Sequence, residues 1–253
     1  MPILPGCDGD EPGTLEDVRL IFVYAGGEVH MTITYLENYG YLIEAVNCTI
    51  LIDYVKGKLP DMRTDKPIYV LASSRDPNHY NERIFRLDDL YDDVYYFLSS
   101  DIEGGNRIPK ARQKLVTFIH PDEDFSLARF HLHAMPTGAL GVAFSFDVST
   151  FRVLHAGSLA DAFQPTDEGK RAHRQFLKAL EKLEQDYDIA FLPADPALGG
   201  HMATCAREIV DGRRIGKIFP MGFQNDWTVP GQLSKALERE VEPVHKRGQV
   251  WEV

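Results

Sequence analysis

Residues 66–85 read KPIYVLASSRDPNHYNERIF and combine three kinds of local sequence in quick succession. The apolar run at 68–72, rich in β-branched and aromatic residues, predicts a buried strand. The polar run at 73–81 predicts a loop, and the apolar spacing across 82–90 predicts a helix. Strand, polar loop and helix in this order commonly build a site, because the strand end and the helix start hold the loop side chains in place.

Strand-like runs dominate both sides of this loop. Before it, the predicted strands form an antiparallel meander that leads to Asp53, at 18–24, 31–36, 41–45 and 49–52. After it, strands are predicted at 94–98, 115–119, 128–133, 142–148, 151–155, 188–193 and 215–219. Further helices are predicted at 166–185, 202–210 and 232–239.

This order of elements predicts a single α/β domain over 1–253, with two sheets packed between helices. Residues 1–17, rich in Pro, Gly and acids, are expected to form a loose leader. The apolar side chains on one side of the predicted helix at 166–185 are expected to be core, namely Phe176, Leu177, Leu180 and Leu183.

Composition limits the function classes. The 253 residues carry a formal net charge of −11, which argues against a general binder of nucleic acid or of an anionic membrane. Three distant cysteines form neither a disulfide framework nor a Cys-x-x-Cys zinc site. The start of the chain has no apolar secretory signal, so we expect a cytoplasmic protein. A homo-oligomer and a small-molecule partner both stay open.

Five separated stretches carry a further pattern: ITYLENYGYLIEA (33–45), TILIDYVKGKLP (49–60), YVLASSRDPNHYNERIF (69–85), VLHAGSLAD (153–161), and FLPADPALGG (191–200) with FPMGF (219–223). Together, in this order, they resemble the metallo-β-lactamase superfamily, in particular a bacterial branch of it. In the first stretch the superfamily has a small or polar residue before the Gly. The resemblance implies a four-layer αβ/βα sandwich. It also implies hydrolysis of esters, thioesters, amides, phosphodiesters or lactones by a metal-bound hydroxide, whose pKa the metal lowers to about 7.

The resemblance also marks where this chain departs from the superfamily's metal-binding pattern. The loop pattern H-x-H-x-D-H falls on residues 74–79, the bridging aspartate falls one residue after Gly157, and the last histidine falls in P-M-H. The residues at those six positions are Ser74, Asp76, Asn78, His79, Ser158 and Gly222. Zinc needs about four donors drawn from His, Cys and carboxylate, so this set predicts a degenerate, metal-free centre.

Two hypotheses follow. The first is a pseudoenzyme that binds a small ligand, or acts in regulation or assembly, through a remnant cleft formed by Asp53 and the six positions above. The second is a hydrolase of the same superfamily, acting on an ester, amide or phosphodiester with a rebuilt or metal-free site. Its catalytic candidates are Asp76, His79 and Ser158, with Ser74 or Ser158 as nucleophile, His79 as base, and Asp53 or Asp76 as the orienting acid.

Other features of the sequence leave further alternatives. Asp76 and Asn78 could hold a weakly bound divalent cation through oxygen donors. His131 and His133 share one side of a predicted strand, which suits either a replacement metal pair or an ordinary half-exposed strand face. A purely structural, self-associating protein is a third hypothesis. The sequence specifies no substrate.

Overall fold

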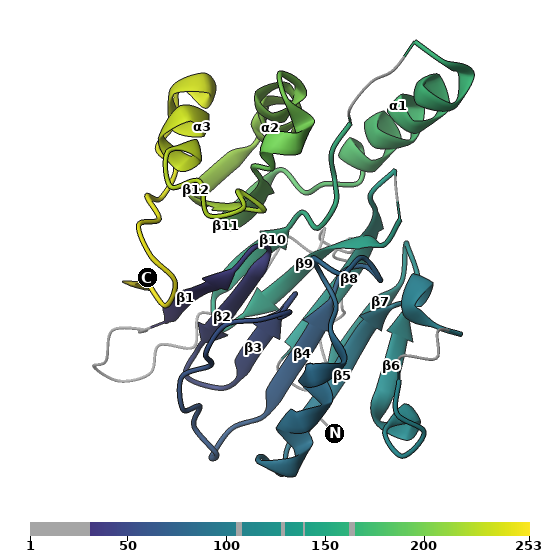
Figure 1. Ribbon diagram of the computed structural model, residues 1–253, viewed down its shortest axis with the longest axis vertical. Helices are drawn as coiled ribbons and strands as arrows, with labels where there is room; N and C mark the ends of the chain where they lie inside the picture. The colour runs from purple at the N-terminus through teal and green to yellow at the C-terminus, as the bar shows by residue number, and fades with distance from the viewer. Residues whose placement is uncertain (1–30, 105–107, 128–129, 139, 162–164) are drawn as a thin grey trace, which may run out of the picture.

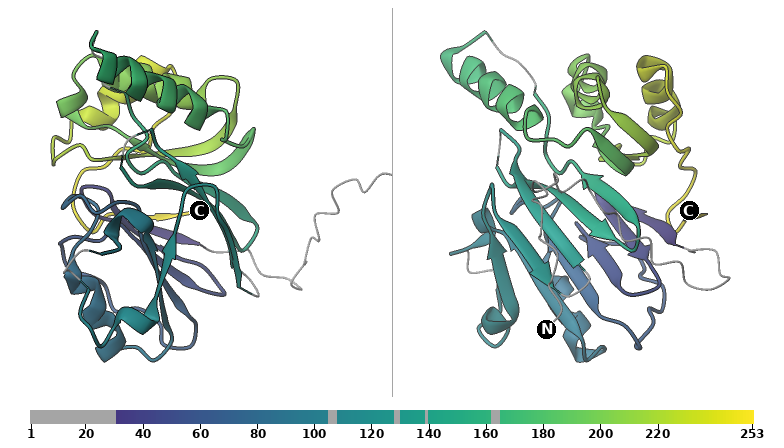
Figure 2. Two further views of the ribbon diagram at one scale, coloured as in Figure 1. Left: turned by 90° about the vertical axis from the view of Figure 1, so that its right-hand side faces the viewer. Right: turned by 180° about the vertical axis from the view of Figure 1, so that it is seen from behind.

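The chain folds into two facing sheets, seen from three directions in Figures 1 and 2. The computed structural model describes residues 31–104, 108–127, 130–138, 140–161 and 165–253. The leader predicted at 1–17 and the strand predicted at 18–24 lie outside the described residues.

The first sheet has seven strands in the order β13-β1-β2-β3-β4-β5-β6. Their bounds are β1 (Thr32–Glu37), β2 (Gly40–Glu44), β3 (Thr49–Ile52), β4 (Ile68–Ala72), β5 (Val94–Ser99), β6 (Val116–Ile119) and β13 (Val250–Glu252). The pairs β1–β2 and β2–β3 are antiparallel, which confirms the predicted meander. From β3 to β6 the pairing is parallel, so the carboxyl ends of these strands meet at one edge.

The second sheet has six strands in the order β12-β11-β10-β9-β8-β7. Their bounds are β7 (Asp124–Leu127), β8 (Phe130–Pro136), β9 (Val142–Val148), β10 (Phe151–His155), β11 (Asp186–Pro193) and β12 (Arg214–Met221). The strands β10, β11 and β12 pair in parallel. Ser158, Asp195 and Gly222 therefore follow three strand ends at a common edge.

Helices cover the outer sides of the two sheets (Figure 2). The second sheet is covered by α1 (Asp167–Leu180), α2 (His201–Val210) and α3 (Val229–Leu237). The first is covered by the 3₁₀ helix η1 (Glu82–Asp89), and the single-turn segments are η2 (Ser100–Ile102), η3 (Gln113–Leu115) and η4 (Pro196–Leu198). The predicted four-layer sandwich is confirmed.

The strands of the first sheet bury both faces. Leu42 and Leu51 belong to the hydrophobic cluster under η1, whereas their neighbours Ile43 and Ile50 belong to the central cluster between the sheets. Successive residues of a strand point to opposite sides, so a strand buried on both sides reads as a continuous apolar run. This is why the runs at 49–52 and 68–72 contain so few polar residues.

Several predicted details of the elements are wrong. The helix predicted at 82–90 is 3₁₀ in character, and the one predicted at 166–185 ends at Leu180. The helix predicted at 232–239 instead begins at Val229 and ends at Leu237, so Pro230 lies inside its first turn. A proline is tolerated there because the N–H groups of the first turn have no partner within the helix. Leu177, expected in the core, is 40% exposed, while Phe176 is buried.

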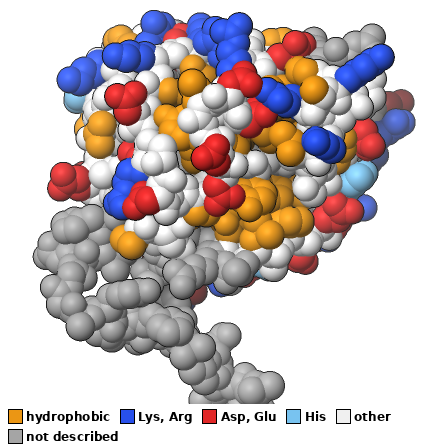
Figure 3. All heavy atoms as spheres, turned by 90° about the horizontal axis from the view of Figure 1, so that it is seen from below, with side chains coloured by type: hydrophobic (Ala, Val, Ile, Leu, Met, Phe, Trp, Pro, Cys, Tyr) orange, Lys and Arg blue, Asp and Glu red, His pale blue; other side chains and the backbone are white. Residues whose placement is uncertain are grey.

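The surface seen from below in Figure 3 carries acidic and basic side chains mixed around a patch of hydrophobic ones. Neither sign of charge forms a continuous stripe on this face. Among the described residues, no helix is long and apolar enough to cross a membrane.

Candidate functional site

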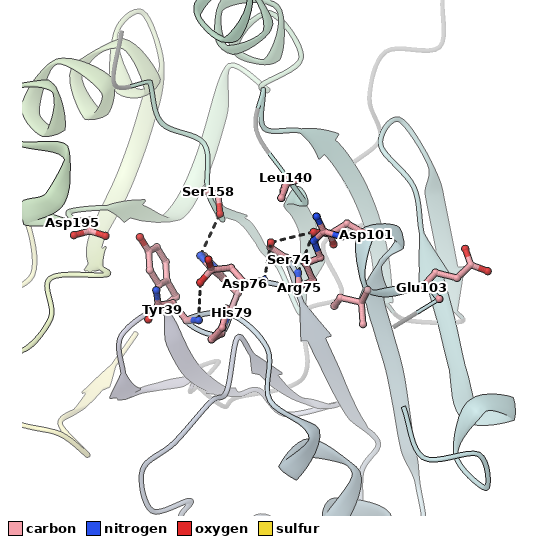
Figure 4. A pocket seen from close by; sticks show the side chains of 14 residues that line it. Tyr39, Ser74, Arg75, Asp76, His79, Asp101, Glu103, Leu140, Ser158 and Asp195 are labelled. Carbon is pink, nitrogen blue, oxygen red and sulfur yellow. Dashed lines mark hydrogen bonds between the residues drawn. The ribbon is translucent and has the colours of Figure 1, made fainter. Parts of the chain in front are cut away.

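A cleft of about 790 Å³ opens where the strand ends of the two sheets face each other (Figure 4). It is lined by five of the positions predicted from the sequence, Ser74, Asp76, Asn78, His79 and Ser158. The other lining residues that matter below are Tyr39, Arg75, Asp101, Glu103 and Asp195. The loop at 73–81 and the loop after β10 therefore converge on one site, as the resemblance predicted.

Asp53 lies buried behind the cleft, directly after β3. Its Oδ1 accepts from the Ser73 backbone N–H at 2.7 Å, and its Oδ2 accepts from Ser73 Oγ at 2.6 Å and faces His79 Nδ1 at 2.7 Å. Burial alone would raise the pKa of this carboxyl, but the nearby His79 and His155 and the hydrogen bonds from His79 and Ser73 hold the pKa below its ordinary value. Asp53 is therefore a carboxylate at neutral pH.

His79 connects Asp53 to the loop after β10. Its ring is almost fully buried, with Nδ1 toward Asp53 and Nε2 at 3.2 Å from Ser158 Oγ. Because the Asp53 carboxylate can only accept, we assign the proton of the neutral ring to Nδ1. Nε2 then presents a lone pair to the Ser158 hydroxyl, which donates to it (Figure 4).

Tyr39, in the turn between β1 and β2, packs on His79 with ring centroids 4.0 Å apart and a 34° angle between the planes. A Cβ added to Gly222 would lie 2.5 Å from Tyr39 Cζ, so the tyrosine ring fills the space that a side chain at 222 would need. Burial first, then the negative charges of Asp195, Asp53 and Asp76 and a hydrogen bond with Asp195, raise the pKa of the Tyr39 hydroxyl. Tyr39 is thus a neutral donor.

His155, at the end of β10, is completely buried behind this group. Its Nε2 lies 3.3 Å from the Tyr39 carbonyl oxygen, and its Nδ1 accepts from the Gly157 N–H at 3.3 Å. Burial lowers the pKa of the imidazole, although Asp53 and the Tyr39 carbonyl oppose the shift. A neutral His155 therefore ties the turn at Tyr39 to the loop that carries Ser158, rather than serving only as core packing.

The other side of the cleft is acidic. Ser74 Oγ donates to Asp101 Oδ2 at 3.2 Å, and the Arg75 N–H donates to the same oxygen at 3.1 Å. Ser74 Oγ also accepts from the Asp76 N–H, and Asp76 Oδ1 accepts from the Asn78 N–H at 2.8 Å. The buried Asp101 Oδ1 finds no hydrogen-bond partner among the described residues. These loop side chains satisfy one another, while one carboxylate oxygen stays unpaired.

The residues present do not fit the dinuclear metal centre that the fold implies. Ser74 and Asn78 offer a hydroxyl and an amide, which are poor zinc ligands, and both are engaged in loop hydrogen bonds. Position 222 has no side chain, and Tyr39 stands in its place. Over the part of the chain that the structure describes, no group of three or more His, Cys, Asp or Glu residues could hold a metal ion.

His131 and His133 lie on β8 and are absent from the residues that line the cleft. His133 Nδ1 is 2.9 Å from Asp124 Oδ1, and Ser126 Oγ is 2.9 Å from His131 Nδ1. The two histidines share one side of the strand, as predicted. The idea that they rebuild the metal centre is wrong, because their partners are strand neighbours on β7 rather than the cleft residues.

No protein-family model matches this chain, and no curated protein matches it. Solved structures do match. Igni18, a metallo hydrolase from Ignicoccus hospitalis, is 15% identical with a TM-score of 0.63, over 88% of this chain and 98% of its own. The metallo-β-lactamase fold protein YhfI from Bacillus subtilis is 15% identical with a TM-score of 0.62, over 89% and 100%. The chain therefore has the metallo-β-lactamase fold.

A third similar structure differs in chemistry. CmlA, a diiron β-hydroxylase from Streptomyces venezuelae, is 13% identical with a TM-score of 0.60, over 90% of this chain and 54% of its own. The neighbours thus include both hydrolases and a hydroxylase, so the fold alone does not specify a reaction.

Sequence reasoning missed several residues of this site. Tyr39 had a signal, because the resemblance expects a small or polar residue before Gly40 and the chain has a large aromatic one. Asp101 follows β5, whose carboxyl end lies beside that of β4, so strand order would have pointed to it. Asp195 caps η4 after β11 and is reached by the same reasoning.

Proposed function

We propose that this protein binds a small, positively charged organic molecule in the cleft and does not act as a metal-dependent hydrolase. The observation that carries the proposal is the group of four carboxylates among the residues that line the cleft, Asp76, Asp101, Glu103 and Asp195. A positively charged ligand would supply the counter-charge that this group lacks.

The charges around the cleft support a cationic ligand. Among the residues that the structure describes, one guanidinium lines the cleft beside these four carboxylates, that of Arg75. Carboxylates grouped in a concave site raise the local concentration of cations. An ammonium or guanidinium group would form charge-assisted hydrogen bonds with carboxylates that line the cleft.

The size of the cleft supports an organic molecule rather than a bare ion. At about 790 Å³ it lies in the range of about 300–1,000 Å³ usual for small-molecule sites. A divalent cation held by Asp76 and Asn78 is less well supported, because Asp76 Oδ1 already accepts from the Asn78 N–H. The Asn78 side-chain oxygen Oδ1 accepts from Asn38 Nδ2 at 3.3 Å.

The test uses agmatine and spermidine as cationic probes and glutarate as the anionic control, with titration calorimetry and thermal melting. We expect the cations to bind and to raise the melting temperature, and glutarate to do neither. Asp101→Asn should weaken cation binding about tenfold, since a hydrogen bond to a charged group contributes about 1.5–3 kcal/mol. The matched control is Asp61→Asn, an exposed carboxylate outside the cleft.

Two results would overturn the proposal: equal affinity for cations in Asp101→Asn, or stoichiometric Zn, Mn or Fe in protein purified without chelator. The metal result would restore the hydrolase expected from the fold. A regulatory or assembly role, including self-association, stays a prediction that light scattering with and without agmatine can check.

A further inference from the structure

We infer that Ser158 is a nucleophile activated by His79 and Asp53, and that it accepts an acyl group from an activated ester bound in the cleft. This inference rests on the proposed function in one respect, that the cleft admits a small organic molecule. It adds a metal-independent activity to the same site.

The three side chains lie in the order that nucleophilic catalysis needs. Asp53 Oδ2 is 2.7 Å from His79 Nδ1, and His79 Nε2 is 3.2 Å from Ser158 Oγ. The carboxylate fixes the ring orientation and the tautomer, and the free nitrogen faces the hydroxyl. A nucleophile–base distance at about 3.2 Å is within the range for a site without ligand, where such bonds are often longer.

Burial separates this group from ordinary surface pairs. Asp53 is fully buried and His79 is 3% exposed, while both Ser158 and His79 line the cleft where a substrate carbonyl would lie. The Tyr39 ring and Asp53 leave the imidazole little freedom to turn away. By contrast, Ser126 also pairs with a histidine, His131, but at an exposed strand surface.

The neighbouring Ser73 cannot take this role. Its hydroxyl is fully buried and donates to Asp53 Oδ2 at 2.6 Å. It also lies 3.0 Å from His79 Nδ1, the nitrogen that carries the proton rather than the lone pair. Ser158 is therefore the serine that faces both the basic nitrogen and the cleft.

The step balances without a metal or an oxidant. Ser158 Oγ attacks the carbonyl carbon of the ester, and its proton passes to His79 Nε2. The carbon–oxygen bond to the leaving group then breaks, and His79 gives the proton to the departing oxygen. The products are an alcohol or phenol and an ester of Ser158, with His79 neutral again. The Asp53 carboxylate stabilises the imidazolium formed between the two transfers.

The experiment incubates the full chain with p-nitrophenyl acetate, follows p-nitrophenolate release, and locates the acetyl group by peptide mass spectrometry. We expect one acetyl group on Ser158, none in Ser158→Ala, and unchanged labelling in the matched control Ser126→Ala. His79→Gln should slow labelling about 100-fold or more while Ser158 remains in place. Thermal melting of each variant identifies any that has simply lost its fold.

Acetyl groups elsewhere, or labelling of Ser158 at the same rate in His79→Gln, would overturn the inference. Because the ester is uncharged, this readout does not depend on the cation preference. If agmatine binds but Ser158 stays unmodified, the inference fails and the proposed function stands. If Ser158 is acetylated but no cation binds, the inference stands and the proposed function fails.

Discussion

The cleft has two unlike walls. The relay wall consists of Tyr39, His79 and Ser158, with Asp53 and His155 buried behind them, and the acidic wall consists of Ser74, Asp76, Asp101 and Glu103. On the relay wall, both ring nitrogens of His79 and both carboxylate oxygens of Asp53 have protein partners. On the acidic wall, Asp101 keeps an oxygen without a partner among the described residues.

The difference shows two ways of filling the space between strand ends when metal ligands are absent. The relay wall replaces metal contacts with internal hydrogen bonds and a tyrosine ring. The acidic wall brings three carboxylates to the cleft lining, which a cationic ligand would neutralise under the proposed function. Stability should therefore depend on the first wall and affinity on the second, and the predictions below test this division.

The largest effect is expected from rebuilding the metal site across both walls. The ligand-restoring set is Ser74→His, Asp76→His, Asn78→Asp, Ser158→Asp and Gly222→His. With Tyr39 present, the ring collides with any side chain at 222, so we expect the other restored ligands to hold at most one zinc ion per chain. Adding Tyr39→Ala should allow a second zinc ion, since a zinc site can supply about 10 kcal/mol of binding energy.

Elemental analysis of the purified variants measures the outcome, and thermal melting of each metal-free form controls for loss of the fold. Two zinc ions per chain in the set that retains Tyr39 would show that the tyrosine does not hold the place of the last ligand. It would also mean that the two walls are less independent than their contacts indicate.

The next largest effect is expected from Asp53→Asn. The asparagine amide has nearly the shape of the carboxylate, and asparagine tolerates the positive φ of 47° at this position. It removes the negative charge of the carboxylate, whose oxygens accept from Ser73 and face His79. A hydrogen bond to a charged group contributes about 1.5–3 kcal/mol, so we expect the free energy of unfolding to fall by about that amount. Urea denaturation measures it. Asp101→Asn, on the acidic wall, is the comparison, and an equal loss there would contradict the division.

The pH dependence of stability distinguishes the contributions of two buried groups, His155 and Asp53. Burial lowers the pKa of His155, so between its folded value and about 6.5 the unfolded chain binds more protons. Stability should therefore fall as pH drops below about 6.5, by up to about 1.4 kcal/mol per unit. The pKa of Asp53 is also lowered, so its contribution is present above about 3.9 and is lost only as pH falls through its folded value.

Urea denaturation at about pH 7.5, 6.5 and 5.5 measures the slope assigned to His155. His155→Gln keeps a polar side chain without an imidazole that titrates, so its stability should change less over this range. An equally steep loss in the variant would place the titrating group elsewhere.

Much of the fold could be predicted from local sequence. The strands that became β1 to β5 are apolar runs between turn signals, and their buried faces explain that pattern. The edge strands β7 and β13 were not predicted. Both are short, four and three residues, and carry acidic residues, so their conformation is set by pairing with β8 and β1.

The site was predictable as a set of positions but not as a set of contacts. The resemblance placed Ser74, His79 and Ser158 around one cleft, and the structure brings them there. It did not reveal that Tyr39 replaces a side chain at 222, because those residues are distant in sequence and meet only through the packing of two sheets. Nor does residue type alone show which nitrogen of His79 faces Ser158.

The smallest effect is expected from Tyr39→Phe. The variant loses the hydroxyl that bonds Asp195 but keeps the ring against His79, so the free energy of unfolding should fall by about 1 kcal/mol. Asp195 retains the Ala197 N–H and Gln224 Nε2 as donors, each at 2.8 Å, which limits the cost.

The same substitution identifies which part of Tyr39 matters to the relay wall. A Cβ at 222 would lie 2.5 Å from the ring carbon Cζ and 2.9 Å from Cε2, so the ring itself fills the space. Tyr39→Phe combined with the ligand-restoring set should therefore still exclude the second zinc ion, whereas Tyr39→Ala should admit it. A second zinc ion in the Phe variant would assign the block to the hydroxyl and its bond to Asp195 instead of the ring.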